Sequence, residues 1–194
     1  MSRNNIIRKV FILAGFCLIA GALILLFVWQ WNIHRSQQTA KELVRVIQEQ
    51  IPEPQGAVLE ERRENAMATL SVNGTDFVGL LELPQYESIL PICANGEKTA
   101  KYPCRLSGSV YDRTLQIGAT SQKGQYDFYR DISVGDPVFF TDMEGNRYAY
   151  TVTDVRNEKN ADQATLQRKE ASLTLLIKNV YAFEYIVLYC DVLN

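Results

Sequence analysis

Cysteine and histidine are two residue types whose side chains often serve as a nucleophile and as a general acid. The four cysteines, Cys17, Cys93, Cys104 and Cys190, are widely spaced and include no Cys-x-x-Cys pair. This spacing excludes a zinc ribbon and a dense disulfide scaffold. His34 is the only histidine, so any mechanism that needs an imidazole in the folded domain must recruit it.

The composition excludes other classes of function. The chain has 20 Lys+Arg and 22 Asp+Glu, a net charge of −2, whereas a nucleic-acid-binding protein carries a basic excess. We therefore expect no nucleic-acid partner. No acidic cluster has calcium-loop spacing, and we expect neither a metal nor a cofactor. Hydrophobic residues make up 47% of the 194 residues, which is enough for a packed core.

An apolar run from Val10 to Trp29 lies near the N-terminus. A helix of this length spans roughly 30 Å, the thickness of the hydrocarbon core of a bilayer. The sequence therefore predicts a transmembrane helix at residues 10–31. A cleaved signal peptide would have a shorter apolar core, and Phe16 breaks the spacing of a lipoprotein signal before Cys17. We prefer a single-pass anchor.

The basic residues around this run set its orientation. Arg3, Arg8 and Lys9 precede the run, and Arg35 follows it. The positive-inside rule then places a cytoplasmic tail at residues 1–9 and the residues that follow the anchor outside the cell. We expect a protein of the cell membrane with an extracellular folded domain.

Residues 36–66 read as a stalk helix and linker. Apolar residues recur at helical spacing from Ala40 to Ile51, and Pro52 stops the pattern. This predicts an amphipathic helix at Gln37–Gln50 that lies on the membrane or on the domain.

The region from 68 to 194 reads as strands. The predicted strands are Phe77–Leu83, Ile89–Cys93, Thr114–Ala119, Pro137–Thr141, Arg147–Asp154, Ser172–Ile177 and Phe183–Leu193. A tight turn at Asp142–Asn146 joins two of them, with Gly145-Asn146 as positive-φ residues. A helical turn is expected at 164–169. The fold class is mainly β, with few short helices, and seven or eight short strands favour a closed or nearly closed β-barrel.

Three segments of this region occur in a characteristic order. The first is Val78–Pro84 with Leu90-Pro91-Ile92, the second is Leu115–Thr120 with Gly135-Asp136-Pro137, and the third is Leu173–Lys178. Their order, their spacing and the N-terminal anchor resemble the sortases, the membrane-anchored cysteine transpeptidases of Gram-positive bacteria. Pro103-Cys104-Arg105 with Gly108-Ser109 further resembles a class B-like subgroup. The resemblance implies a sortase-like barrel of seven or eight strands.

The resemblance also identifies three positions where catalytic groups would lie. In the family a cysteine thiolate attacks the Thr–Gly amide of an LPXTG-type sorting signal, a histidine protonates the leaving amine, and an arginine stabilises the oxyanion. These positions correspond to Lys178, Thr120 and Tyr185. All three functional groups are therefore replaced.

The replacements do not restore the chemistry. The Thr120 hydroxyl does not titrate near neutral pH, an acyl group on Lys178 would be a stable amide, and Tyr185 brings no positive charge. We expect no catalytic residue, and the sequence favours a protein that is not an enzyme. The groove that the resemblance implies would contain Ala119, Thr120, Ser121, Leu176, Lys178 and Tyr185.

The sequence predicts an inactive pseudosortase that binds or scaffolds surface proteins. Its partner would be an LPXTG-type peptide, a pilin or an active sortase. Two alternatives stay open: an atypical transpeptidase that attaches surface proteins to the cell wall or pili through Lys178 or an extracellular thiol, and a purely structural envelope protein. In the plainest interpretation Lys178 is solvated or paired with Glu184. The cysteines beyond the anchor are buried thiols, or two of them form a disulfide and the third is free.

Overall fold

The computed structural model describes residues 15, 17–27, 42–52, 67–96, 101–121, 128, 130–159, 171–179 and 184–193. The chain divides into two compact units, Met1–Thr39 and Ala40–Asn194. In the first unit, residues 17–27 form a helix with exposed apolar side chains such as Leu18 and Phe27. Within the described residues, no helix is both long and apolar enough to cross a membrane. The remainder of the predicted span at 10–31, and His34, lie outside the described residues.

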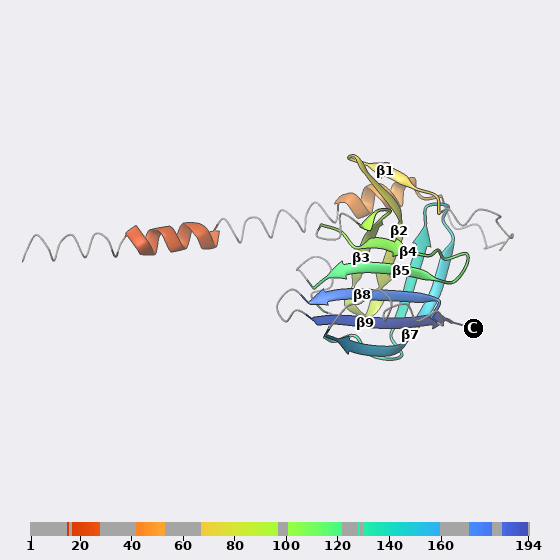
Figure 1. The fold of residues 1–194 in the computed structure, drawn as a ribbon. Coiled ribbons are helices and arrows are strands. Elements are labelled where there is room, and N and C mark those ends of the chain that lie inside the picture. The colour runs from red at the N-terminus through yellow and green to blue at the C-terminus, as the bar shows by residue number, and fades with distance from the viewer. Residues whose placement is uncertain are drawn as a thin grey trace, which may run out of the picture. The chain divides into compact units, whose positions relative to one another are not determined.

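Strands dominate the second unit (Figure 1). In chain order they are β1 (Leu70–Val72), β2 (Thr75–Leu83), β3 (Ser88–Cys93), β4 (Cys104–Ser107), β5 (Leu115–Thr120), β6 (Pro137–Asp142), β7 (Arg147–Glu158), β8 (Leu173–Asn179) and β9 (Glu184–Val192). A short 3-10 helix, η1 (Pro84–Tyr86), connects β2 to β3. Neighbours follow the order β1-β2-β3-β4-β5-β8-β9-β7-β6, and β6 pairs back onto β2. Strands β2 to β9 therefore close into an eight-stranded barrel, which confirms the predicted architecture.

The seven predicted strands all form, with shifted ends. The largest shift is in β7, which was predicted to end at Asp154 and continues to Glu158. The sequence missed β1 and β4 because segments of three and four residues are too short to show a period. The predicted helical turn at 164–169 lies outside the described residues.

The two faces of the barrel wall are set by residue alternation. In β8, Leu173, Leu175 and Ile177 belong to the interior core, whereas Leu176 belongs to a separate buried cluster with Ala171, Val187 and Tyr189. This second set lies on the outer face of β8 and β9. Both faces of β8 are therefore buried at Leu175–Ile177, which explains the apolar run Leu175-Leu176-Ile177.

Closure of the barrel requires a glycine on β2. Gly79 pairs with Asp142 of β6, and a Cβ at this position would fall on the Phe140 ring and the Thr141 carbonyl. Only glycine lets the two strands approach this closely.

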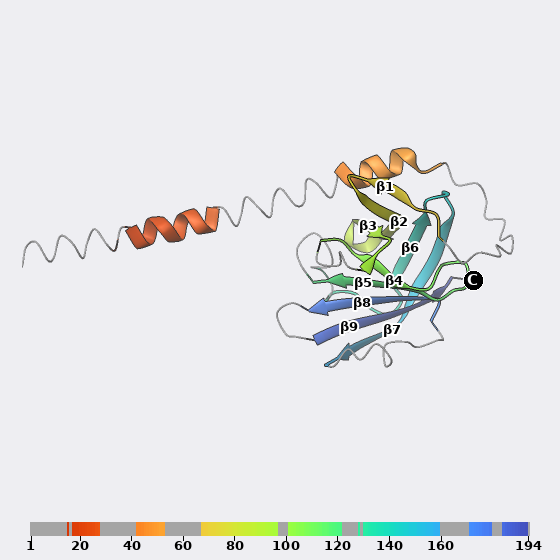
Figure 2. The ribbon, with the colours of Figure 1, turned by 45° about the horizontal axis from the view of Figure 1, so that its top comes forward.

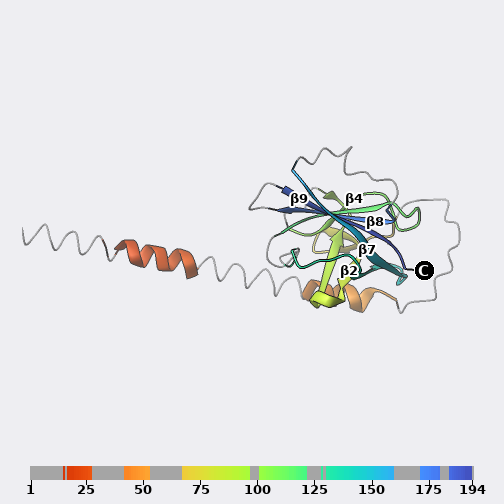
Figure 3. The same cartoon turned by 90° about the horizontal axis from the view of Figure 1, so that it is seen from below.

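Residues 42–50 form a helix beside β1 and β2 of the same compact unit (Figures 2 and 3). Leu43, Val44 and Ile47 are buried against Phe77 and Leu80 of β2. The sequence left two positions open for this helix, on the membrane or on the domain, and the structure shows it packed against the barrel. The predicted start at Gln37 lies outside the described residues.

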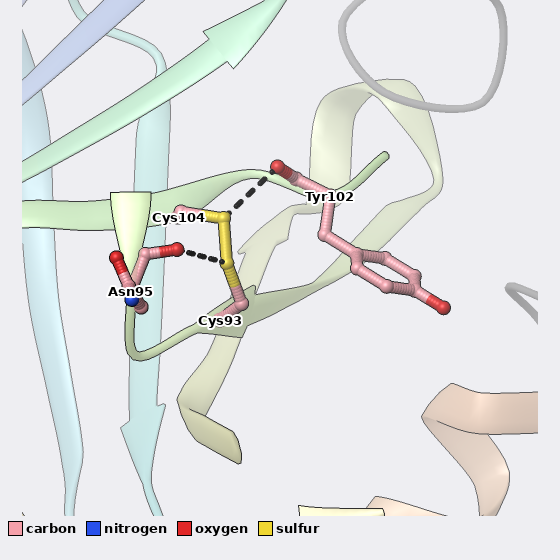
Figure 4. Close-up of a disulfide and its surroundings, with 4 residues drawn as sticks. All are labelled: Cys93, Asn95, Tyr102 and Cys104. Atoms are coloured by element: carbon pink, nitrogen blue, oxygen red, sulfur yellow. Dashed lines mark hydrogen bonds between the residues drawn. A yellow bond between two sulfur atoms is a disulfide. The ribbon is translucent and has the colours of Figure 1, made fainter. Parts of the chain in front are cut away.

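A disulfide closes the seam between β3 and β4. Cys93 and Cys104 form the only residue pair that joins these two strands, and they are bonded to each other with their Cα atoms 4.3 Å apart. Both side chains are fully buried. The carbonyl oxygens of Asn95 and Tyr102 lie 3.1 and 3.3 Å from the two sulfur atoms (Figure 4). The sequence left two alternatives open for these cysteines, buried thiols or a disulfide. The pairing of β3 with β4 brings Cys93 and Cys104 together, and the disulfide forms.

The predicted β6–β7 turn forms by a different device. Gly145 has a positive φ of 87°, as predicted, whereas Asn146 does not adopt a positive φ, so the prediction is wrong for Asn146. The buried Asp142 carboxylate instead accepts the backbone N–H groups of Glu144 and Asn146 at 3.0 and 2.9 Å. This Asx-type turn satisfies the backbone with a side chain.

Candidate functional site

Strand register brings the three positions identified from the sequence into one row. Thr120 of β5 pairs with Lys178 of β8, and Lys178 pairs in turn with Tyr185 of β9. Figure 1 shows these three strands as direct neighbours in the barrel wall. Adjacent strands lie about 4.8 Å apart, so these three positions, separated along the sequence, form one continuous row. We call Thr120, Lys178 and Tyr185 the outer row.

The outer row faces away from the barrel interior. The residues that precede Thr120 and Lys178, Ala119 and Ile177, pack in the interior core together with Ile186. Because successive side chains point to opposite faces, the outer row stands on the other side of the wall. The structure therefore separates Ala119 from the rest of the expected groove.

The other two expected groove residues lie beside the outer row. Ser121 donates its N–H to the Lys178 carbonyl at 2.9 Å, which extends the β5–β8 pairing by one residue, and its side chain is buried. Leu176 precedes Lys178 by two residues on the same face and packs with Val187 and Tyr189. Thr120, Lys178, Tyr185 and Leu176 thus share the outer face, and Ser121 is joined to the row through its backbone.

Lys178 is the exposed member of the outer row, whereas Thr120 is buried and Tyr185 is half-buried. Within the part of the chain that the structure describes, Lys178 forms no ion pair, and Glu184 is not its partner. The plain interpretation of a solvated lysine fits this geometry better than the ion-paired one.

Cys190 does not reach the outer row. It pairs with Leu173, five residues along β9 from Tyr185, which is roughly 17 Å at about 3.4 Å per residue. Its side chain is fully buried in the interior core. Burial raises the pKa of the Cys190 thiol, with the nearby Asp191 charge adding to the effect. A thiol in this environment is inert.

The other cysteines are also unsuited to catalysis at the outer row. Cys93 and Cys104 are bonded to each other, and Cys17 is an exposed residue of the helix at 17–27 in the first unit. Among the described residues of the barrel, no cysteine presents a free thiol on the surface. Within the same residues, no group of three or more His, Cys, Asp or Glu side chains is placed to hold a metal ion.

The sequence missed two charged residues of β7 that lie next to the outer row. Glu158 pairs with Tyr185 and so continues the row onto a fourth strand. Arg156 pairs with Val187, forms an ion pair with Asp154 at 2.7 Å and lies over the Tyr189 ring at 5.5 Å. Its guanidinium is turned toward these partners. The end of β7, Asp154–Glu158, is polar and shows no apolar period. Only by continuing the alternation of Tyr148–Val152 could the sequence have predicted that the strand extends to Glu158.

The barrel matches solved structures at low sequence identity. Sortase A from Corynebacterium diphtheriae, a lid mutant, matches with a TM-score of 0.53 at 14% identity over 62% of this chain and 72% of that chain. Sortase C-1 from Actinomyces oris gives 0.52 at 14% identity, over 61% and 76% of the two chains. Sortase C from Clostridium perfringens with the C-terminal cell wall sorting motif gives 0.50 at 16% identity, over 61% and 71%.

The fold is sortase-like. No protein-family model matches the chain, and no curated protein matches it by sequence. The similar structures named above are sortases A and C, so the class B-like subgroup stays a prediction. At this level of identity the sortase-like structures establish the architecture alone, and the role of the outer row must be argued from its own chemistry.

Proposed function

We propose that this protein is a catalytically inactive, membrane-anchored sortase-like protein whose extracellular domain binds an extended peptide of the sorting-signal type. The observation that carries the proposal is the outer row. The three positions that the resemblance assigns to catalysis are adjacent across β5, β8 and β9, yet they hold a hydroxyl, an ammonium and a phenol. The arrangement of a site is kept while its reactive groups are replaced.

Loss of these groups is expected to abolish turnover. Removing the members of a catalytic unit costs several orders of magnitude in rate. The free thiol of the barrel, Cys190, is buried in the core, and the single histidine of the chain is His34. Cys190 therefore supplies no nucleophile at the outer row, and His34 lies outside the described residues.

Two further observations support an extracellular peptide-binding role. The Cys93–Cys104 disulfide is typical of proteins in oxidising compartments, which agrees with the topology expected from the apolar run at 10–31. The matched Clostridium perfringens sortase C structure contains the C-terminal cell wall sorting motif. A pilin or another surface protein that ends in such a segment is the partner class we propose.

The proposal is tested with the full chain in detergent micelles. The chain is incubated with an LPXTG-type peptide and a glycine nucleophile, with an active sortase as the positive control, and products are followed by mass spectrometry. We expect no cleaved or transferred peptide. Turnover at the rate of the active sortase would overturn the inactive assignment, and a persistent acyl adduct on Lys178 or Cys190 would instead support an atypical enzyme.

Binding is measured separately with the same peptide by fluorescence anisotropy. We expect saturable binding that the double variant Lys178→Ala/Tyr185→Ala weakens by about tenfold or more, because both side chains lie on the outer row and contacts that involve a charge contribute about 1.5–3 kcal/mol each. Arg113→Ala is the matched control, since Arg113 is exposed and precedes β5 at the end opposite Thr120. If the wild-type chain binds no peptide, the protein is better described as a structural envelope component.

A further inference from the structure

The outer row is a set of hydrogen-bond donors around one positive charge. Lys178 carries an ammonium with three donors and no acceptor, and the hydroxyl of the half-buried Tyr185 adds one donor, whereas the Thr120 hydroxyl is buried. Strand pairing on both sides of Lys178 places these groups next to each other. Directly opposed residues on one face have Cβ atoms about 4.5–5.5 Å apart, so a single ligand group can contact more than one of them.

The charge of Lys178 is available to a ligand. Its nearest acidic neighbours by register are Glu158, which lies opposite Tyr185, and Glu184, which lies opposite Asn179. Neither forms an ion pair with Lys178 in the part of the structure that is described. Arg156, the other cation on this face, is already paired with Asp154. Lys178 is thus the cation of this face that has no carboxylate partner among the described residues.

An anion with two acceptor oxygens fits this set of donors. A carboxylate accepts several hydrogen bonds at once, and those from a charged donor are roughly twice as strong as neutral ones. The neutral carbonyl of an internal peptide bond carries no charge to balance an ammonium. Leu176 and Val187, on the same face, are buried, so Lys178 is the exposed group of this part of the wall.

We propose that the outer row binds the C-terminal carboxylate of a peptide. The inference rests on the proposed function and adds the chemical class of the ligand end. If the row binds a sorting-signal peptide at the position where a transpeptidase would cleave it, Lys178 favours a peptide that already ends there over one that continues. The protein would then recognise cleaved or released ends and distinguish them from intact sorting signals.

The test compares three peptides on the full chain in detergent micelles. They are an LPXT-type peptide with a free C-terminal carboxylate, the same peptide with a C-terminal amide, and an amidated peptide with Asp at its last position. We expect the free acid to bind about tenfold more tightly than the plain amide, as one charge-assisted contact implies. Added salt should reduce this preference because Lys178 is exposed.

Three variants assign the preference to Lys178. Lys178→Gln should remove the preference for the free acid, Lys178→Arg should keep most of it because the charge remains, and Arg113→Gln, at the end of β5 opposite Thr120, should leave it unchanged. Equal binding of acid and amide would overturn the inference while the proposed function stands. Equal binding of the free acid and the Asp peptide would also overturn it, since the row would then recognise any carboxylate. Absence of binding by all three peptides would refute the proposed function itself.

Discussion

At the scale of single residues, position relative to the barrel wall decides what each reactive side chain can do. Lys178 and Cys190 lie on neighbouring strands, but the first is exposed on the outer face and the second is fully buried in the core. The sequence shows a lysine and a cysteine that are both candidates for covalent chemistry. Alternation along β8 and β9 is what separates them.

We predict that Cys190 resists alkylation in the native protein. A Cys17→Ser chain treated with iodoacetamide should remain unmodified, because burial raises the pKa of the Cys190 thiol and excludes the reagent. Unfolding in denaturant without reductant should expose one reactive thiol, and added reductant should expose two more from Cys93 and Cys104. Intact mass spectrometry counts the adducts. Rapid labelling of the native chain would show that Cys190 is accessible and would reopen the case for a displaced catalytic thiol.

At the scale of elements, two of the strand pairings that complete the barrel, β2–β6 and β3–β4, differ in the number of paired residues. β2 and β6 are joined by four residue pairs, whereas β3 and β4 are joined by the single pair Cys93–Cys104. A covalent bond therefore lies where the hydrogen-bonded ladder is shortest. The helix at 42–50 contributes Leu43, Val44 and Ile47 to the buried cluster that contains both cysteines.

Removal of the disulfide should destabilise the barrel measurably. Cys93 and Cys104 are 11 residues apart in the sequence, and a disulfide typically contributes roughly 2–4 kcal/mol to stability. A Cys93→Ala/Cys104→Ala chain should therefore unfold at a lower urea concentration, with its free energy of unfolding reduced by about that amount. Circular dichroism follows the transition. The control is Cys17→Ser, which lies in the other compact unit and should not change the midpoint. An unchanged midpoint in the double variant would mean that β3 and β4 are held by other contacts.

At the scale of the whole molecule, the compact unit that contains the barrel begins at Ala40. The helix at 42–50 contributes three buried apolar residues, Leu43, Val44 and Ile47. Fully burying such a side chain stabilises a protein by about 1.5–3 kcal/mol. The helix is therefore a structural part of the barrel as well as a connection to the preceding segment.

This packing predicts how shortened chains behave. Residues 40–194 should fold cooperatively, whereas residues 68–194 should melt several degrees lower and bind more of a hydrophobic dye, because Phe77 and Leu80 lose their cover. Differential scanning calorimetry and dye fluorescence measure both effects. Ile47→Ala in the 40–194 chain should reproduce part of the loss, at about 2–4 kcal/mol, while Gln48→Ala on the exposed side of the helix should not. Equal melting temperatures for the two fragments would refute this role.

The amino-acid sequence alone determined the strand content and most strand positions, and its resemblance to the sortases identified the three positions of the outer row. Long alternating or apolar runs such as Phe77–Leu83 and Tyr148–Val152 carry their period locally, so they can be identified without tertiary contacts. The polar end of β7 and the short strands β1 and β4 lack that local signal. They form because neighbouring strands complete their hydrogen bonds.

Only the tertiary structure decided which residues meet. The register of β5, β8 and β9 makes Thr120, Lys178 and Tyr185 neighbours and turns Ala119 to the opposite face. The pairing of β3 with β4 likewise selects Cys93 and Cys104 as disulfide partners. Register is a property of two strands together, and a shift of one residue would move every side chain to the other face, so no single segment of sequence contains this information.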